Sequence, residues 1–453
     1  MGRKIQHTRN RKKHTLTFKF FRVGPGWYTG LHAAVSDLYH DHHGHLHLAD
    51  KKNPGINQSI FEAATKWLHK NKGFTAENLA EKPPAELVNE INRVLSQAVK
   101  DGLSSGIKHE IPPALTQALD KNVFVFSGLK TYHELKEASL LLKDENGGIV
   151  PYDKFKQQML KLNETYNTNY LNTEYNFATQ TAQMAAKWND IEQDGDEYWL
   201  QFRTSRDEKV RESHDALHNT TLPPSDPFWD SYMPPLDWNC RCTVVQVLKD
   251  KYAQSNSAQA VGKGETATTR IDKKGVNRAA MFRFNPGKQK VIFPQNHPYF
   301  KVQQGVTGMI DGLYNTAQKI ERKKVDDGIK QWAKTNIPEQ GMKINSEKLI
   351  TGNAILLRKN VRNIAAHLAN TELKKMATEI PDILKRVQPI TQATLSESIK
   401  PKSEANIKRK IERGVTQYNY YSFEYEGETF RLNVELIDGV EFPHSINKII
   451  NAD

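Results

Sequence analysis

The stretch from Trp199 to Val247 constrains the fold more than any other part of the chain. It contains a strand-like apolar run, a charged segment, a Pro-rich loop and a second strand-like run. Both cysteines of the protein lie in this stretch, Cys240 and Cys242, with Arg241 between them. Because side chains two residues apart in a strand point to the same face, we expect the two sulfur atoms to lie side by side and Arg241 to point away. We also expect the two strand-like runs to pair in one sheet, since they flank a single loop.

The same stretch contains side chains of the kinds that bind zinc. Cys240, Cys242 and His214 supply three ligands, and His218 or Asp207 could supply a fourth. A single Cys-x-Cys lacks the second cysteine pair typical of zinc-binding sequences. We therefore favour two buried structural thiols beside a histidine, and predict no cofactor, with zinc as the alternative. A disulfide is least expected, because neighbouring strand positions suit its geometry poorly.

The order of residues in this stretch resembles a family of phage proteins. The residues that carry the resemblance are Arg203, Asp207, Arg211, His214, Asp226, Pro227, Phe228, Trp229, Pro234, Pro235, Asn239, Cys240, Arg241 and Cys242. This pattern is similar to that of the phage Mu F-like minor head proteins, which are the head-morphogenesis proteins of tailed phages and prophages. The resemblance covers roughly residues 150–300. It implies a virion protein of the head, made in the bacterial host cytoplasm, with portal and capsid proteins as partners.

The length and composition are those of a soluble protein with several domains. A chain of 453 residues is long enough for two to four domains with cores of their own. No run approaches the about 18 apolar residues that a membrane span needs, so we expect no membrane segment. Lys19 and Arg22 interrupt the apolar stretch near the N-terminus, which disfavours a secretory signal. Two cysteines in so long a chain also disfavour a disulfide-stapled secreted protein.

The N-terminal segment is strongly basic. Residues 1–36 contain no acidic side chain, and residues 3–22 contain eight basic ones. These are Arg3, Lys4, Arg9, Arg11, Lys12, Lys13, Lys19 and Arg22. Together with the net charge of +12, they indicate an arm that binds a polyanion, which for a head protein would be the phage DNA. A merely solubilising tail is an equal alternative.

A histidine-rich segment follows the basic arm. Residues 40–47 contain five histidines and Asp41. Such a segment can bind metal ions in vitro, but it lacks the fixed spacing of a defined site. We therefore assign it no biological metal.

The pattern of apolar residues predicts an α+β protein of several domains. We expect a basic and His-rich arm over residues 1–50, a helical region over 51–150, a Mu F-like α+β domain over 151–300, a helical linker over 301–340 and a small α+β domain over 341–453. Apolar residues recur at helical spacing from Ile60 to Leu103, and again from Pro151 to about Ile191. Residues 254–269 have the composition of a flexible linker. Residues 282–293 are predicted to form a hairpin around Asn285-Pro286-Gly287.

The C-terminal part differs in charge and in pattern. Residues 358–413 contain thirteen Lys and Arg against six Asp and Glu, whereas the chain from Gly414 onward contains seven acids and two bases. Alternating apolar residues on both sides of Gly427 predict an antiparallel hairpin with its turn at that glycine.

Short motifs in this part resemble the small nucleases of the barnase, EndoU, colicin and RelE type. They are Ala366-His367-Leu368, Glu372-Leu373, Ile380 to Leu384 and the Tyr-rich hairpin. The resemblance implies RNA cleavage without a metal, with the 2′-hydroxyl as nucleophile. His367 and His444 could then exchange protons near neutral pH. Lys410, Arg413 and Arg431 could stabilise the phosphate, and Tyr418 or Tyr420 could stack on a base. The alternative for His367 is a histidine that packs on or caps a helix.

Three functions remain open from the sequence. The first is a head protein, the second is a ribonuclease toxin delivered with the virion, and the third is a nucleic-acid-binding module without catalysis. We favour the head protein, with the C-terminal domain as a fused cargo enzyme or an inactive remnant.

Overall fold

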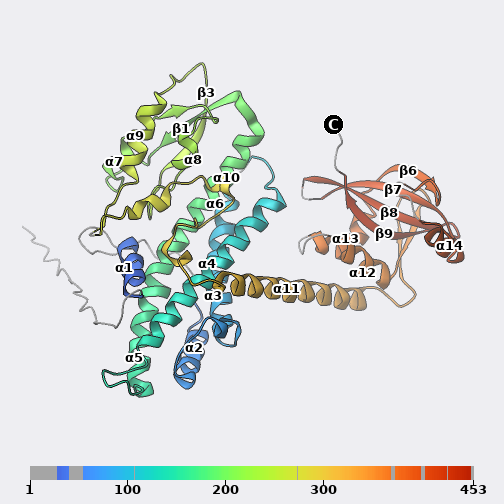
Figure 1. Cartoon of the computed structure of the whole chain (residues 1–453). Helices are drawn as coiled ribbons and strands as arrows, with labels where there is room; N and C mark the ends of the chain where they lie inside the picture. Colours follow the sequence, from blue (N-terminus) through green and yellow to red (C-terminus); the bar gives the residue numbers. More distant parts are fainter. Residues whose placement is uncertain are drawn as a thin grey trace, which may run out of the picture. The chain divides into compact units, whose positions relative to one another are not determined.

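The computed structural model describes residues 28–39, 55–106, 108–272, 274–368, 373–398, 403–425 and 427–449. Residues 1–27, which contain the eight basic side chains of the arm, and the histidine-rich segment 40–47 lie outside these residues, so their predictions stay untested. The chain divides into two compact units, Met1–Ile310 and Asp311–Asp453 (Figure 1). Its mixture of helices and sheets confirms the predicted α+β class. Among the described helices, none combines the length and the apolar character that crossing a bilayer requires.

Helices make up most of the first unit. They are α1 (Tyr28–Tyr39), α2 (Gln58–Asn71), α3 (Pro84–Leu103), α4 (Pro113–Leu140), α5 (Tyr152–Asn163) and α6 (Leu171–Asp194), with a π-helical turn at Glu164–Tyr170 and short 3₁₀ turns at Glu77–Ala80 and Gly195–Glu197. The predicted apolar stripe of α3 is fully buried against α4 and α6. Gly102 permits the close approach to α6, because a Cβ there would lie 2.3 Å from the carbonyl oxygen of Thr179.

A three-stranded antiparallel sheet follows α6. It consists of β1 (Tyr198–Arg203), β2 (Thr221–Leu222) and β3 (Thr243–Leu248), in the order β2-β1-β3. Arg203 pairs with Thr243 and Phe202 with Val244, which confirms the predicted pairing of the two runs. Strand β3 begins only at Thr243, so both cysteines lie in the segment just before this strand. Between the strands lie the one-turn helices α7 (Glu212–Asp215) and α8 (Phe228–Ser231).

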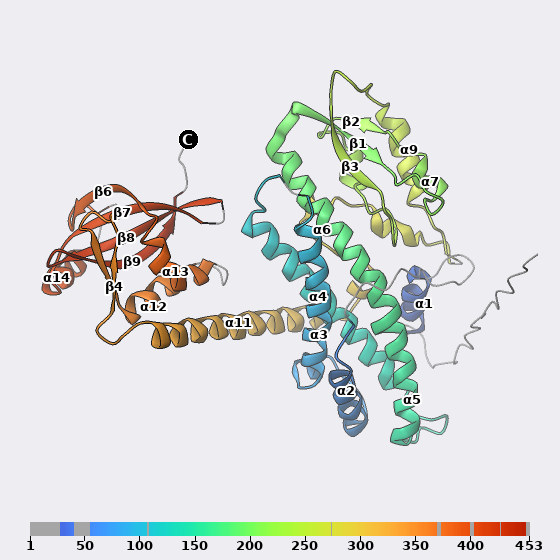
Figure 2. The same ribbon diagram turned by 180° about the vertical axis from the view of Figure 1, so that it is seen from behind.

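The prediction of a flexible linker over residues 254–269 is wrong. These residues contain α9 (Ser257–Ala267), which lies beside α7 (Figures 1 and 2). The side chain of Asn256 caps the helix by accepting a hydrogen bond from the backbone N–H of Gln259. Gly264 then packs directly on the ring of Tyr232, where a Cβ would lie 2.6 Å from the ring. The small residues thus serve close packing.

The predicted hairpin over residues 282–293 is also wrong. The segment contains the end of a 3₁₀ turn, Arg278–Phe282, and a one-turn helix, α10 (Pro286–Gln289). The side-chain oxygen of Asn285 accepts hydrogen bonds from the backbone N–H groups of Gly287 and Lys288. A capping asparagine followed by proline is a helix start, and it outweighs the apolar flanks on which the hairpin was predicted. A further 3₁₀ turn follows at Pro298–Phe300.

The second unit is a six-stranded sheet with helices. Its elements are most of α11 (Val306–Asn336), β4 (Met342–Asn345), β5 (Asn353–Leu356), α12 (Arg358–His367), a 3₁₀ turn at Leu373–Lys375, α13 (Met376–Ile383), β6 (Gln388–Thr394), α14 (Glu404–Glu412), β7 (Val415–Tyr425), β8 (Glu428–Ile437) and β9 (Val440–Lys448). The strand order is β4-β5-β9-β8-β7-β6. Tyr421 pairs with Leu432 across the turn at Gly427, which confirms the predicted hairpin.

The two faces of this sheet have different coverings. One face carries Tyr421, Phe423 and Leu432, which form a core with α11, α12 and α13. The other face carries Tyr418 and Tyr420, which form a smaller core that includes Ile407 of α14. Because side chains alternate along a strand, polar residues of β8 that lie between its apolar ones belong to the second face.

Candidate functional site

The imidazole of His214 lies against both cysteines of the chain. Its Nδ1 is 3.6 Å from Cys240 Sγ and 3.8 Å from Cys242 Sγ. His214 belongs to α7, and the cysteines come from the segment before β3, so the sheet pairing brings them together. His214 and Cys240 are each 2% exposed, Cys242 is partly exposed, and both thiols are free. The two sulfur atoms thus lie on one side of the segment, as predicted.

The two thiols of this cluster differ in acidity. The pKa of Cys240 lies well below its usual value, chiefly because Cys242 donates a hydrogen bond to the thiolate, with His214 contributing as well. The pKa of Cys242 is raised by the same hydrogen bond and by burial. Cys240 is therefore the more acidic thiol of the two. Three donor atoms of the types that bind soft metals, one nitrogen and two sulfurs, lie within 4.8 Å of one another.

The two residues predicted as a fourth ligand have other partners. His218 Nδ1 accepts a hydrogen bond from the backbone N–H of Thr204 and contacts its hydroxyl at 2.9 Å. Asp207 forms a two-pronged ion pair with Arg241, which holds the pKa of the carboxyl below its usual value. Arg241 therefore points away from the sulfur atoms, as expected. Among the described residues, the metal-binding group is limited to the three ligands above.

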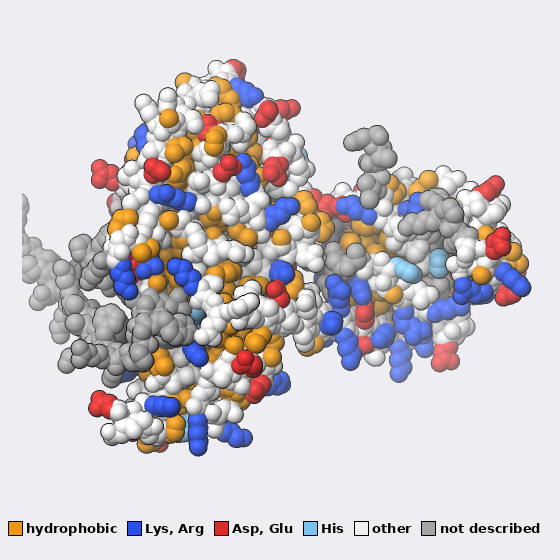
Figure 3. Space-filling view, in the orientation of Figure 1, with side chains coloured by type: hydrophobic (Ala, Val, Ile, Leu, Met, Phe, Trp, Pro, Cys, Tyr) orange, Lys and Arg blue, Asp and Glu red, His pale blue; other side chains and the backbone are white. Residues whose placement is uncertain are grey.

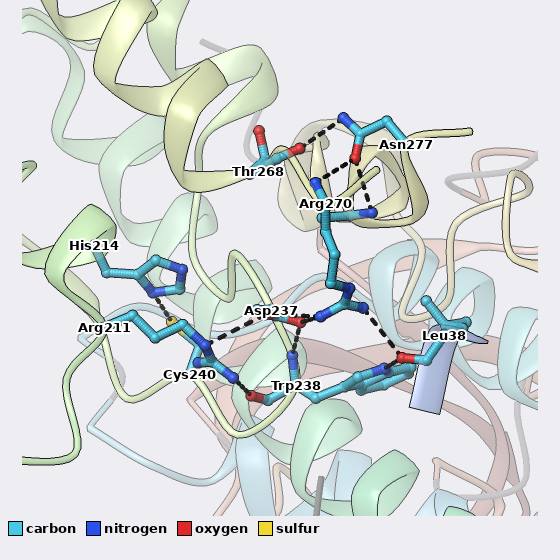
Figure 4. A network of polar contacts seen from close by, with 10 residues as sticks. Leu38, Arg211, His214, Asp237, Trp238, Cys240, Thr268, Arg270 and Asn277 are labelled. Atoms are coloured by element: carbon cyan, nitrogen blue, oxygen red, sulfur yellow. Dashed lines mark hydrogen bonds and ion pairs between the residues drawn. The ribbon is translucent and has the colours of Figure 1, made fainter. Parts of the chain in front are cut away.

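A buried ion-pair network lies beside this cluster (Figure 4). Asp237 accepts from Arg270 at 3.2 Å and lies 3.4 Å from Arg211. Arg211 also donates to the backbone carbonyl of Trp238 at 3.1 Å. Arg270 also donates to the carbonyl of Leu38, the same oxygen that the indole N–H of Trp238 reaches at 3.0 Å. The network joins α1, the loop before β3 and the segment after α9.

Trp238 is the apolar anchor of this loop. It is fully buried, stacks on Tyr39 at 5.0 Å and meets Phe177 and Phe282 edge to face at 4.9 and 5.2 Å. Such a ring contributes stabilisation through its large buried area. Asn239 follows with φ +55°, a left-handed conformation that asparagine tolerates better than most residues. The chain can therefore turn directly from the anchor to the cysteines.

The sequence motif is thus largely one structural cluster. Asp207, Arg211, His214, Asn239, Cys240 and Cys242 all lie around the loop before β3, whereas Arg203 ends β1 opposite Thr243. Sequence reasoning missed Asp237 and Arg270. An acidic residue directly before a large aromatic one, as Asp237 before Trp238, could have indicated a buried carboxylate. Nothing in the spacing of the sequence indicates Arg270 as its partner.

In the second unit, three of the predicted catalytic residues gather around an acid that the sequence analysis missed. Glu435 of β8 is 1% exposed and forms ion pairs with Lys410 and, at 2.8 Å, with Arg413. His444 Nδ1 lies 3.6 Å from the Glu435 carboxylate, and its Nε2 lies 3.5 Å from Lys410 Nζ. The alternation of Arg431, Asn433 and Glu435 along a strand was the signal for this polar face.

The other two predicted catalytic residues lie apart from this cluster. Arg431 lies over the ring of Tyr420 at 5.6 Å and donates to Asn433. His367 is an exposed residue at the end of α12, and α12 packs on the opposite face of the sheet. Figure 3 shows Lys and Arg side chains gathered along the edge of this unit, where α11, α12 and α14 lie. Such a surface attracts polyanions.

Comparison with known proteins gives matches in the first unit. Residues 146–245 match the family model described as Phage Mu protein F like protein. The chain contains a Mu F-like region. This region runs from just before α5 into β3 and includes His214 and both cysteines, whereas Arg270 lies beyond it.

Two curated relatives agree with this match. One is protein F of Escherichia phage Mu, named as a candidate capsid assembly protein, which is 38% identical over 75 residues, or 16% of this chain and 17% of the relative. The other is the Mu-like prophage FluMu F protein of Haemophilus influenzae, 32% identical over 136 residues, or 29% of this chain and 30% of the relative. The matches thus span less than a third of either relative. No match was found among solved structures.

Proposed function

We propose that this chain is a phage head protein that acts in head assembly, in contact with portal and capsid proteins. The observation that carries the proposal is the match of residues 146–245 to the Mu F-like family, together with similarity to a protein named for capsid assembly. In this proposal the chain is made in the cytoplasm of a bacterial host and ends in the head of the virion. The basic arm would bind the packaged DNA.

The burial of the motif supports a structural role, rather than a catalytic one, for the Mu F-like region. Trp238, His214 and Asp237 are 0%, 2% and 7% exposed. Trp238 holds the loop before β3 against α1 and α6. A catalytic centre needs a concave site open to its substrate. Side chains buried to this degree instead fix the shape of a surface that other head proteins would contact.

The proposal is tested by locating the protein in purified particles. DNA-filled heads from the phage that encodes the chain would be separated from free protein and analysed by quantitative mass spectrometry. We expect the chain in the heads at a fixed ratio to the portal protein. Its absence from heads, with the chain abundant in the remaining lysate, would refute the proposal.

A second candidate function concerns the second unit. We infer that it is a ribonuclease that needs no metal, carried as cargo or as a virion-delivered toxin. The observation that favours this is the gathering of Lys410, Arg413 and His444 around Glu435. His444 is 28% exposed and would carry a proton, with Glu435 orienting it. Arg413 is 46% exposed and would meet the phosphate of the RNA.

The ribonuclease function is tested on the full chain with a labelled RNA. Cleavage should persist in EDTA, because side chains alone would supply the acid, the base and the cations. A folded full-length protein that cuts no RNA and does not harm cells on expression would refute this second function. The chain would then be a head protein with an additional binding domain.

A further inference from the structure

The cluster of His214, Cys240 and Cys242 has the dimensions of a metal site. His214 lies 26 residues before Cys240 and 28 before Cys242 in the sequence, yet the three donor atoms lie within 4.8 Å of one another. Each segment is fixed independently of any ion. Arg211, just before α7, holds the carbonyl of Trp238, and Asp207 holds Arg241 between the two cysteines.

The distances within the cluster agree with those of a zinc ligand set. Zinc bonds of about 2.3 Å to sulfur and about 2.0 Å to nitrogen place tetrahedral ligands about 3.6 Å apart. The observed separations of 3.6 and 3.8 Å between Nδ1 and the two sulfur atoms agree with this distance between ligands. In a neutral imidazole, Nδ1 offers a single donor or acceptor direction. Two sulfur atoms at nearly equal distance from one nitrogen are therefore better explained by three corners of a tetrahedron.

The surroundings of His214 agree with ligation through Nδ1. The ring is 2% exposed, and Nε2 has no hydrogen-bond partner among the described residues. Nδ1 is thus the nitrogen directed at the sulfur atoms. Without an ion, Nδ1 is shared between two thiols, whereas an ion would give this nitrogen a single bond along its lone pair.

We propose that His214 Nδ1, Cys240 Sγ and Cys242 Sγ bind one zinc ion, with water or an external ligand in the fourth position. Thiolate and imidazole donors select zinc over hard cations such as magnesium. The ion would fasten α7 to the segment before β3, so its role is to stabilise this loop. This inference does not depend on the proposed role in head assembly.

The proposal is tested by metal analysis of the full-length chain, purified under reducing conditions without chelators. We expect about one zinc ion per chain bound at this site. The Cys240→Ser/Cys242→Ser and His214→Ala variants should lose that ion. His218→Ala is the matched control, because this nearby histidine is engaged with Thr204, and it should keep the ion. The variant comparison also separates this site from any zinc held by the histidine-rich segment.

Cobalt substitution of the wild-type chain provides a second measurement that needs no variant. Cobalt bound here should show the thiolate charge-transfer absorption and the visible bands of a tetrahedral sulfur site. Circular dichroism checks that each variant is folded. Three results would each overturn the proposal: a folded, reduced wild-type chain that takes up no zinc at this site, zinc fully retained by the double cysteine variant, or a cobalt spectrum without thiolate bands.

Discussion

Arg270 and Asp237 form an ion pair that is almost completely shielded from water. The two groups meet at 3.2 Å, and their side chains are 11% and 9% exposed. Removing one partner of such a pair leaves the other charge buried and uncompensated. This pair holds the loop that presents the cysteines, and it lies partly outside the segment that matches the Mu F-like family.

The first prediction concerns the stability of this pair. Arg270→Ala should lower the free energy of unfolding of the first unit by about 3–5 kcal/mol. Lys82→Ala, which removes an exposed ion pair with Glu86, should cost less than about 1 kcal/mol. Chemical denaturation followed by tryptophan fluorescence measures both. Equal losses of unfolding free energy in the two variants would show that the buried ion pair does not stabilise the first unit more than an exposed pair does.

The second prediction concerns the buried carboxyl of Glu134 on α4. Burial raises its pKa to about 8, with Lys130 opposing the shift and Glu137 and Glu174 reinforcing it. The folded state then keeps a proton that the unfolded state has lost. The contribution of the neutral Glu134 carboxyl to the free energy of unfolding is therefore fully present below about pH 4.5. It is lost progressively as the pH rises to about 8.

Glu134→Gln removes this titration and keeps the oxygen that accepts from Asn167 at 2.6 Å. Between about pH 5 and about pH 8, the denaturation midpoint of the wild-type chain should fall more than that of the variant. Parallel curves for the two proteins would mean that Glu134 does not titrate in this range.

The sequence determined local features better than it determined long-range partners. The apolar runs around β1 and β3 and the alternation around Gly427 predicted the strand pairings, because side-chain period is a local property. The pairing of Asp237 with Arg270 spans 33 residues and leaves no periodic trace. The burial of Glu435 could not be predicted from the pattern of β8, because the alternating apolar residues Leu432 and Val434 indicate only the face of the sheet that they bury.

Composition was the weakest guide. The residues around α9 are small and polar, as in a linker, yet a capping Asn256 and the packing of Gly264 on Tyr232 make them a helix. Likewise, Asn285 starts a helix where apolar flanks suggested a hairpin. Whether small residues give flexibility or close packing depends on the neighbour that covers them, and the sequence does not specify that neighbour.

The third prediction concerns RNA cleavage by the second unit. His444→Ala should slow cleavage by about a hundredfold or more if this histidine carries the proton. Lys410→Ala should also reduce cleavage, because it removes a cation beside Glu435. Lys385→Ala is the matched control: it removes the same charge from an exposed position just after α13, on the opposite face of the sheet, and should leave the rate unchanged. Equal rates in all three variants would exclude this cluster as the catalytic site.

The fourth prediction concerns the basic arm. Deleting residues 1–22 from the chain removes eight basic side chains. If all of them contact phosphates, the slope of log affinity for DNA against log salt should decrease in magnitude by up to about 7. Fluorescence anisotropy over a salt series measures it. An unchanged slope would show that the arm does not contact the DNA.

The central claim is the role in head assembly, and a deletion with complementation in the encoding phage tests it most directly. Without this gene, electron microscopy of induced cultures should show few or no DNA-filled heads, and the titre of infectious particles should collapse. Both should be restored by the wild-type gene and also by His444→Ala, because that change lies in the second unit. Normal numbers of filled heads and an unchanged titre in the deletion would contradict the account.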